Sequence, residues 1–218
     1  LVRQHAASPE PATASPAAPP AAGEPVVSSP HGSPTSLPLE IYNSAGRGEL
    51  QKVVKWLRKE GPVDALGPVP TLNGKTATFG LLHAAAGNGQ LEMAMELLKQ
   101  GASVDLQGSR GSTALMIAAA QGHLSIVLLL LHHSANPDLQ SSEGSTALMM
   151  AAYEGQRACV QALLRAGANT ELLDEAGRTA LWWAKDQAHT ATAQLIRQHA
   201  APPQPAAPPA APPDAGEP

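Results

Sequence analysis

The sequence has few of the residues on which disulfides, metal centres and aromatic cores depend. Cys159 is the one cysteine among 218 residues, so the chain can form neither an internal disulfide nor a cysteine-rich zinc site. We therefore expect an intracellular protein, cytoplasmic or nuclear. Aromatic residues make up only 3% of the chain, so aliphatic side chains must form most of any core.

Long apolar runs and an excess of basic charge are also missing. Apolar runs such as residues 126–131 are far shorter than the roughly 20 residues of a membrane-spanning helix. The net charge of −4 leaves no basic surplus to neutralise phosphates. We therefore expect a protein that neither crosses a membrane nor binds nucleic acid.

Both ends of the sequence differ in composition from the middle. Residues 1–38 and 201–218 are rich in proline and alanine and have few large apolar side chains. Such segments bury too little surface to offset the conformational entropy lost on folding. We predict that both are disordered linkers that flank a folded domain at residues 39–200.

The two ends also resemble each other. The run LVRQHAASPEP begins at Leu1, and the similar run LIRQHAAPPQP begins at Leu195. This match predicts a tandem duplication with a period of about 193 residues. On this interpretation residues 1–7 are the remnant of a preceding repeat, and the chain is a fragment of a longer protein that carries further arrays.

The middle of the sequence has a shorter period of 33 residues. Gly111, Gly144 and Gly177 share this spacing, and so do the threonine and leucine that follow each of them by two and four residues. We expect each threonine to cap a helix and each leucine to enter the core. The second helix of one unit, at about 123–132, is apolar nearly all round, which predicts that other helices cover it on both sides.

These units resemble the ankyrin repeat, whose first helix opens with Thr-Pro-Leu-His-x-Ala. The matching runs are TALMIAA at 113–119, TALMMAA at 146–152 and TALWWAK at 179–185, with a further match at 81–105. The resemblance implies an all-α ankyrin-repeat solenoid of about five helix-turn-helix repeats with projecting β-turn loops. The repeats are expected at about 39–65, 66–107, 108–140, 141–173 and 174–200.

Two departures from the family pattern concern the loops. Alanine replaces the signature proline in three repeats and the signature histidine is kept only at His83, so we expect weaker hydrogen bonding between adjacent loops. About eight extra residues lie between the first two repeats, which predicts one loop that protrudes beyond the others.

Nothing in the sequence indicates catalysis. The repeated serines, Ser112 and Ser145, follow the structural period, and the third copy of their motif drops the serine. The neighbouring His132 and His133 should point to different sides of a helix end and not share a metal. Cys159 falls on the interior side of a helix and is expected to be buried. We predict a non-catalytic chain without cofactor or metal.

The resemblance implies a protein or peptide partner on the concave face that the first helices and loop tips form. Tyr153, Arg110 and Arg178 are the predicted anchors, because tyrosine and arginine are enriched at interface hot spots. Trp182 and Trp183 are interpreted as a cover for the exposed end of the array, with an indole-lined partner pocket as the alternative. The further candidate contacts are Gln121, Glu143, Glu154, Glu175, Asp186 and Gln187.

We expect a monomeric interaction module. Two other functions stay open at this point. The array could be a rigid spacer without a tight partner, or it could recruit substrates for an enzyme whose catalytic domain lies outside this chain.

Overall fold

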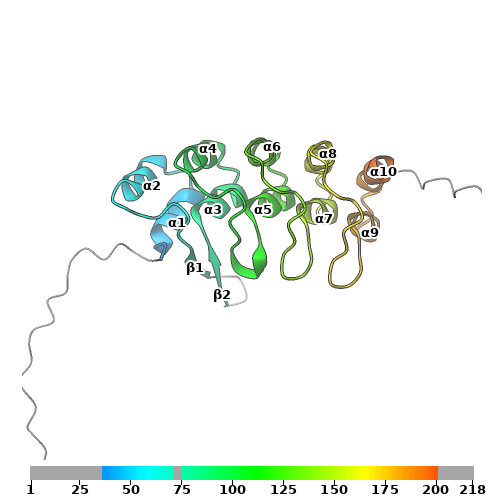
Figure 1. Cartoon of the computed structure of the whole chain (residues 1–218), viewed down its shortest axis with the longest axis horizontal. Helices are drawn as coiled ribbons and strands as arrows, with labels where there is room; N and C mark the ends of the chain where they lie inside the picture. Colours follow the sequence, from blue (N-terminus) through cyan, green and yellow to red (C-terminus); the bar gives the residue numbers. More distant parts are fainter. Residues whose placement is uncertain (1–35, 71–74, 201–218) are drawn as a thin grey trace, which may run out of the picture. The chain divides into compact units, whose positions relative to one another are not determined.

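The computed structural model describes residues 36–70 and 75–200 (Figure 1). The predicted linkers, and with them the predicted repeat remnant at residues 1–7, lie outside the described residues except for residues 36–38.

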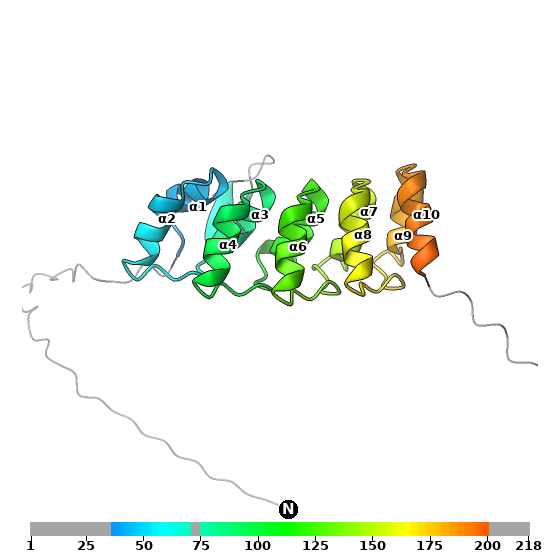
Figure 2. The same cartoon turned by 90° about the horizontal axis from the view of Figure 1, so that it is seen from above.

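The described residues form ten α-helices that follow one another in five pairs, and a short 3-10 helix at Ser109–Gly111. The odd-numbered helices form one layer and the even-numbered helices a second layer, with the connecting loops projecting from the odd-numbered side (Figures 1 and 2). This arrangement confirms the predicted all-α solenoid of helix-turn-helix repeats. The pairs are α1 (Leu39–Gly46) and α2 (Leu50–Leu57), α3 (Leu81–Gly87) and α4 (Leu91–Lys99), α5 (Ala114–Gln121) and α6 (Leu124–His132), α7 (Ala147–Tyr153) and α8 (Arg157–Arg165), and α9 (Ala180–Asp186) and α10 (Thr190–His199).

The repeated threonines start the first helices of repeats three, four and five, as predicted. The Thr113 hydroxyl accepts a hydrogen bond from the backbone N–H of Met116 at 3.3 Å, which satisfies a donor that the helix itself leaves unpaired. Thr146 and Thr179 make the same bond one and two repeats later. At the other end of α5, Gly122 adopts a left-handed conformation with φ of 76° and ends the helix.

In repeat two, the first turn of α3 is bonded through His83, whereas repeats three to five use a threonine cap. The Nδ1 atom of His83 accepts the backbone N–H of Gly80 at 3.2 Å, and its Nε2–H donates to the carbonyl oxygen of Ser112 at 3.0 Å. Burial lowers the pKa of His83 and favours the neutral ring that can donate and accept at once. The retained signature histidine thus connects repeat two to the loop of repeat three.

The core lies between the two helix layers and continues from one repeat to the next. In α6, Ile126, Val127 and Leu130 are buried, whereas Leu128 is 51% exposed. The prediction that helices cover α6 on both sides is confirmed along the array, where α4 and α8 flank it (Figure 1). The helix is not covered all round, however, because Leu128 stays exposed to solvent. Cys159 is buried, as predicted.

Hydrogen bonds join each repeat to the next at two levels. At the loop tips, the Ser142 N–H donates to the Arg110 carbonyl at 2.7 Å and the Glu175 N–H to the Glu143 carbonyl at 3.1 Å. Adjacent loops are therefore directly bonded even where the signature histidine is replaced. In repeats two to five, the residue just before the second helix donates a side-chain hydrogen bond to a main-chain carbonyl in the first helix of the previous repeat. The four donor and acceptor pairs are Gln90 and Gly46, His123 and Gly87, Gln156 and Ala120, and His189 and Tyr153.

The extra residues between the first two repeats form a hairpin. Its strands, β1 (Gly67–Pro70) and β2 (Thr76–Phe79), pair antiparallel with Gly67 opposite Phe79. The Thr78 N–H donates to the Ser109 hydroxyl at 2.8 Å, which fixes the hairpin to the loop of repeat three. Within residues 36–70 and 75–200, the helices are too short or too polar to span a lipid bilayer.

The loop glycines should differ in their tolerance of alanine. Gly144 and Gly177 both have positive φ, at 74° and 72°, a conformation in which a side chain costs about 1 kcal/mol. A Cβ atom on Gly144 would also lie 2.8 Å from the Asp174 Cα, whereas nothing lies within 4 Å of one on Gly177. Gly144→Ala should therefore lower the free energy of unfolding by about 2 kcal/mol and Gly177→Ala by about half of that. Urea unfolding of both variants measures the difference, and equal losses would contradict the loop packing described.

Candidate functional site

The predicted contact residues lie on the loop tips and first helices of repeats three to five. Tyr153 is the last residue of α7 and is 43% exposed. The side chain of Arg178 is only one-third exposed, which is less than the pattern predicts. The remaining predicted residues are all exposed: Arg110, Gln121, Glu143, Glu154, Glu175, Asp186 and Gln187.

A hollow of about 290 Å³ brings three of the predicted residues together. Glu143, Tyr153 and Glu154 line it, and we call it the aromatic hollow. The other lining residues are Ala120, Ser145, Met149, Met150 and Trp183. An indole-lined partner pocket was predicted only as the alternative to a cover for the end of the array. Met149 repeats the core position of Met116, so its contribution to a surface could not be recognised from the period alone. Met150 lies at the variable position of the signature run and is half-buried.

Three aromatic rings follow one another at this site. The rings of Tyr153 and Trp183 are 5.2 Å apart between centroids and meet at 83°. The rings of Trp182 and Trp183 are 5.1 Å apart and meet at 89°. These are the edge-to-face geometries that aromatic pairs prefer. Trp183 is thus a wall of the aromatic hollow, whereas Trp182 is 42% exposed beside it.

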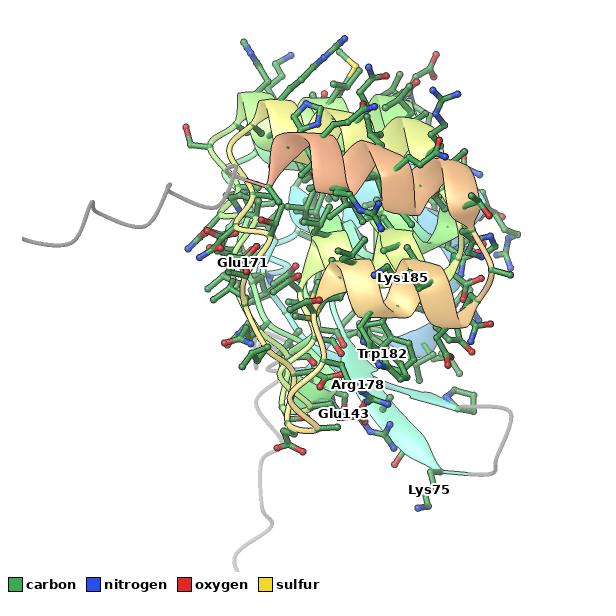
Figure 3. All side chains as sticks on the ribbon, turned by 90° about the vertical axis from the view of Figure 1, so that its right-hand side faces the viewer. Lys75, Glu143, Glu171, Arg178, Trp182 and Lys185 are labelled. Carbon is green, nitrogen blue, oxygen red and sulfur yellow. The ribbon has the colours of Figure 1, made fainter. Side chains whose placement is uncertain are left out.

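Arg178 is held in place by a buried carboxylate and by the indole rings. Its Nε donates to Asp174 Oδ2 at 2.8 Å, and the Asp174 side chain is only 1% exposed. The guanidinium carbon lies 4.0 Å from the centroid of the Trp183 ring. Figure 3 shows Trp182, Arg178 and Glu143 following one another from α9 toward the loop tips. Arg178 is therefore part of the framework of the site rather than a freely available anchor.

Asp174 collects further hydrogen bonds that the sequence analysis did not foresee. It accepts the backbone N–H groups of Ala176 and Arg178 at 2.9 Å each and the indole N–H of Trp183 at 3.1 Å. Burial by itself would raise the pKa of Asp174, but the bonds from Arg178 and Ala176 outweigh it and hold the pKa below its ordinary value. One repeat earlier the same position is Ser141, whose hydroxyl accepts the Ser145 N–H. Repeat three has Gly108 at this position, so the side-chain acceptor is present only in repeats four and five, and only repeat five carries a charged one.

The acidic side chains around the hollow differ in how they are paired. Glu143 forms an exposed ion pair with Arg110 at 3.2 Å, which is weak because water surrounds both groups. Glu154 forms no ion pair with any other described residue. Glu175 and Asp186 are exposed nearby in repeat five but do not line the hollow.

The remaining reactive groups do not converge on this site. Burial raises the pKa of the Cys159 thiol and so disfavours its reactive thiolate form. His132 and His133 are neighbouring exposed rings at the end of α6, 5.8 Å apart between centroids. Across residues 36–70 and 75–200, no three His, Cys, Asp or Glu side chains are grouped to hold a metal ion.

Comparison with known families agrees with this architecture. A family model described as ankyrin repeats (3 copies) matches residues 41–141 and again residues 132–205. Together the two matches cover most of the chain, including all five helix pairs. No curated protein matches the sequence.

Proposed function

Because the chain belongs to the ankyrin-repeat family, whose members are generally protein-protein interaction modules, we propose that it binds a protein or peptide partner on the concave face of its first helices and loop tips. The proposal includes a non-catalytic role, an intracellular location and a monomeric state. The family match supports the general role, and the aromatic hollow supports the choice of surface.

The observation that carries the proposal is the exposure of Tyr153 at the edge of a concave, largely apolar hollow. Interface hot spots are enriched in tyrosine, tryptophan and arginine and lie in pockets that a partner can fill. Here Tyr153 and Trp183 line one hollow, and Arg178 stacks on one of its walls. Because Arg178 and Trp183 are fixed by Asp174, a partner would meet side chains that are already ordered and would lose less conformational entropy on binding.

Affinity capture with matched variants tests the proposal. The wild-type chain, a Tyr153→Ala variant and a Leu128→Ala variant serve as baits. Each variant truncates an exposed apolar side chain, but Leu128 lies on α6 in the other helix layer. We expect a partner that is retained by wild type and Leu128→Ala and lost with Tyr153→Ala. Circular dichroism first verifies that all three baits are folded.

Two other functions are separated by the same experiment. A rigid spacer would retain no protein specifically on any bait. A substrate-recruiting module would retain the substrates of an enzyme whose catalytic domain lies outside this chain. Identical capture by wild type and Tyr153→Ala would contradict the assignment of the binding face.

A further inference from the structure

We infer that the aromatic hollow receives a basic side chain, arginine above all, from a peptide segment of the partner. This inference rests on the proposed function and specifies the chemistry of the partner at one site. It is carried by the walls of the hollow, by the charges on its rim and by an arginine that the chain itself holds in a similar environment.

The walls of the hollow suit the aliphatic stem of a long basic side chain. Met149, Met150, Tyr153 and Trp183 present apolar or aromatic atoms, and Ala120 adds a small apolar side chain to the lining. Arginine and lysine bury their methylene stems against such surfaces while the charged end remains at the water boundary. Methionine adapts its shape to the group it contacts, so these walls do not require one fixed stem conformation.

The rim supplies negative charge where the cation would emerge. Glu143 and Glu154 both line the hollow, and Glu154 has no ion-pair partner among the described residues. Of the two arginines nearby, Arg178 is bonded to Asp174 and Arg110 forms an exposed pair with Glu143. Glu154 is therefore the rim carboxylate that stays without an ion pair among the described residues. A basic side chain in the hollow would therefore gain a carboxylate partner, whereas an acidic one would be repelled.

The chain already holds one arginine by the same combination of groups. The Arg178 guanidinium stacks on the Trp183 ring, 4.0 Å from its centroid, while its Nε bonds to a carboxylate. In the hollow, the Tyr153 ring and the Glu154 carboxylate would supply the same two kinds of contact to an incoming arginine, a ring to stack on and a carboxylate to pair with. Guanidinium groups suit such a site because they are planar, weakly hydrated and always charged.

Proline-rich segments are the other ligands that aromatic-lined grooves commonly accept. This chain has such a segment at residues 201–218, but its charged residues are Asp214 and Glu217 and it has no basic residue. The acidic rim opposes that segment, so the charges favour a basic ligand. The test below includes the proline-rich peptide as a competing ligand.

Nuclear magnetic resonance of the tryptophan side chains detects even weak binding at this site. The probe is the blocked pentapeptide Gly-Ser-Arg-Ser-Gly, added to the ¹⁵N-labelled full chain. We expect the indole N–H signals of Trp182 and Trp183 to shift, while that of Trp56 in α2 stays in place. The same peptide with citrulline, which keeps the shape and loses the charge, should bind about fivefold more weakly.

Matched charge variants locate the contact. Glu154→Gln should weaken binding of the arginine peptide by about fivefold. Glu92→Gln removes the same charge from an exposed position on α4 and should leave the affinity unchanged. Equal binding of the arginine and citrulline peptides would overturn the inference. Tighter binding of a peptide of residues 202–213 would overturn it in favour of a proline-rich ligand.

These outcomes are distinct from failure of the proposed function. If Tyr153→Ala loses a captured partner but the arginine peptide has no advantage over citrulline, the interaction face stands and the basic ligand is wrong. If Tyr153→Ala captures the same proteins as wild type, the choice of face is wrong, and the inference built on it falls too.

Discussion

Replacing Leu130 by alanine should lower the free energy of unfolding by about 2–5 kcal/mol, whereas Leu128→Ala should lower it by less than about 0.5 kcal/mol. Both leucines belong to α6 and lie two residues apart, so the two changes share the same chemistry and the same helix. Leu130 is fully buried and Leu128 is 51% exposed. The difference in the free energy of unfolding between the two variants therefore measures how much a leucine buried between the helix layers stabilises the fold.

The position of Leu130 in the central repeat should extend its effect beyond that repeat. Each repeat of such an array contacts only its neighbours, so a weakened central repeat removes interfaces on both sides. Urea unfolding followed by circular dichroism gives the two free energies. Hydrogen exchange on Leu130→Ala should show faster exchange in α3, α4, α5, α7 and α8 as well as in α6. Equal urea midpoints for the two variants would contradict the core described here.

Replacing Asp174 by alanine should cost about 2–3 kcal/mol, and the loss should be concentrated in repeat five. The carboxylate accepts bonds from Arg178, Ala176 and Trp183, and hydrogen bonds to a charged group are worth more than neutral ones. Its loss leaves the Arg178 guanidinium and the Trp183 indole N–H without their acceptor. A red shift of the tryptophan emission together with a lower urea midpoint would report this loss.

Two companion variants make the Asp174 prediction specific. Asp174→Asn keeps the shape and one acceptor oxygen, so it should lose less stability than Asp174→Ala. Glu175→Ala removes an exposed neighbouring carboxylate that lies outside the hollow and should change stability by less than about 0.5 kcal/mol. An effect of Glu175→Ala as large as that of Asp174→Ala would show that general charge, not the buried network, stabilises the loop.

Acid should weaken the same network. The pKa of Asp174 is lower in the folded chain than its ordinary value, so its ionised form stabilises the fold fully at pH above the unfolded value of about 3.9. Below that pH the unfolded chain takes up a proton before the folded chain does, and the stabilisation is lost as pH falls through the folded pKa. The difference in urea midpoint between wild type and Asp174→Asn should therefore shrink between pH 5 and pH 3. A constant difference would contradict the assignment.

The period of the sequence predicts the repeats because their start and stop signals are local. A threonine cap such as Thr113 acts on a backbone group three residues away, and a glycine such as Gly122 ends its own helix. The period also predicts correctly that Cys159 is buried, because its position repeats the core position of Ile126. It does not predict that Leu128 is exposed, since a helix that is apolar nearly all round does not reveal which of its faces is open to solvent.

The site is less predictable than the fold because it depends on contacts between repeats. The loop-tip and first-helix pattern correctly places Tyr153, Glu143 and Glu154 on the surface, and the structure adds that they share one hollow. The pattern does not show that Arg178 is fixed by Asp174, because an aspartate in a polar loop has no periodic signal of burial. Nor does it show which of the adjacent indoles, Trp182 or Trp183, lines the hollow, since that depends on the side chain of Tyr153 in the previous repeat.

The bonds between consecutive first helices have a consequence for how such a protein can change in length. In each joint the donor is a side chain of the later repeat, and the acceptor is a main-chain carbonyl of the earlier one, as with Gln156 and Ala120. Every amino acid supplies that carbonyl, so the joint places no demand on the side chain at the acceptor position. A duplicated copy of residues 111–143 inserted after Glu143 would therefore find a ready acceptor, and gene duplication or recombination could lengthen the array without compensating substitutions at this joint.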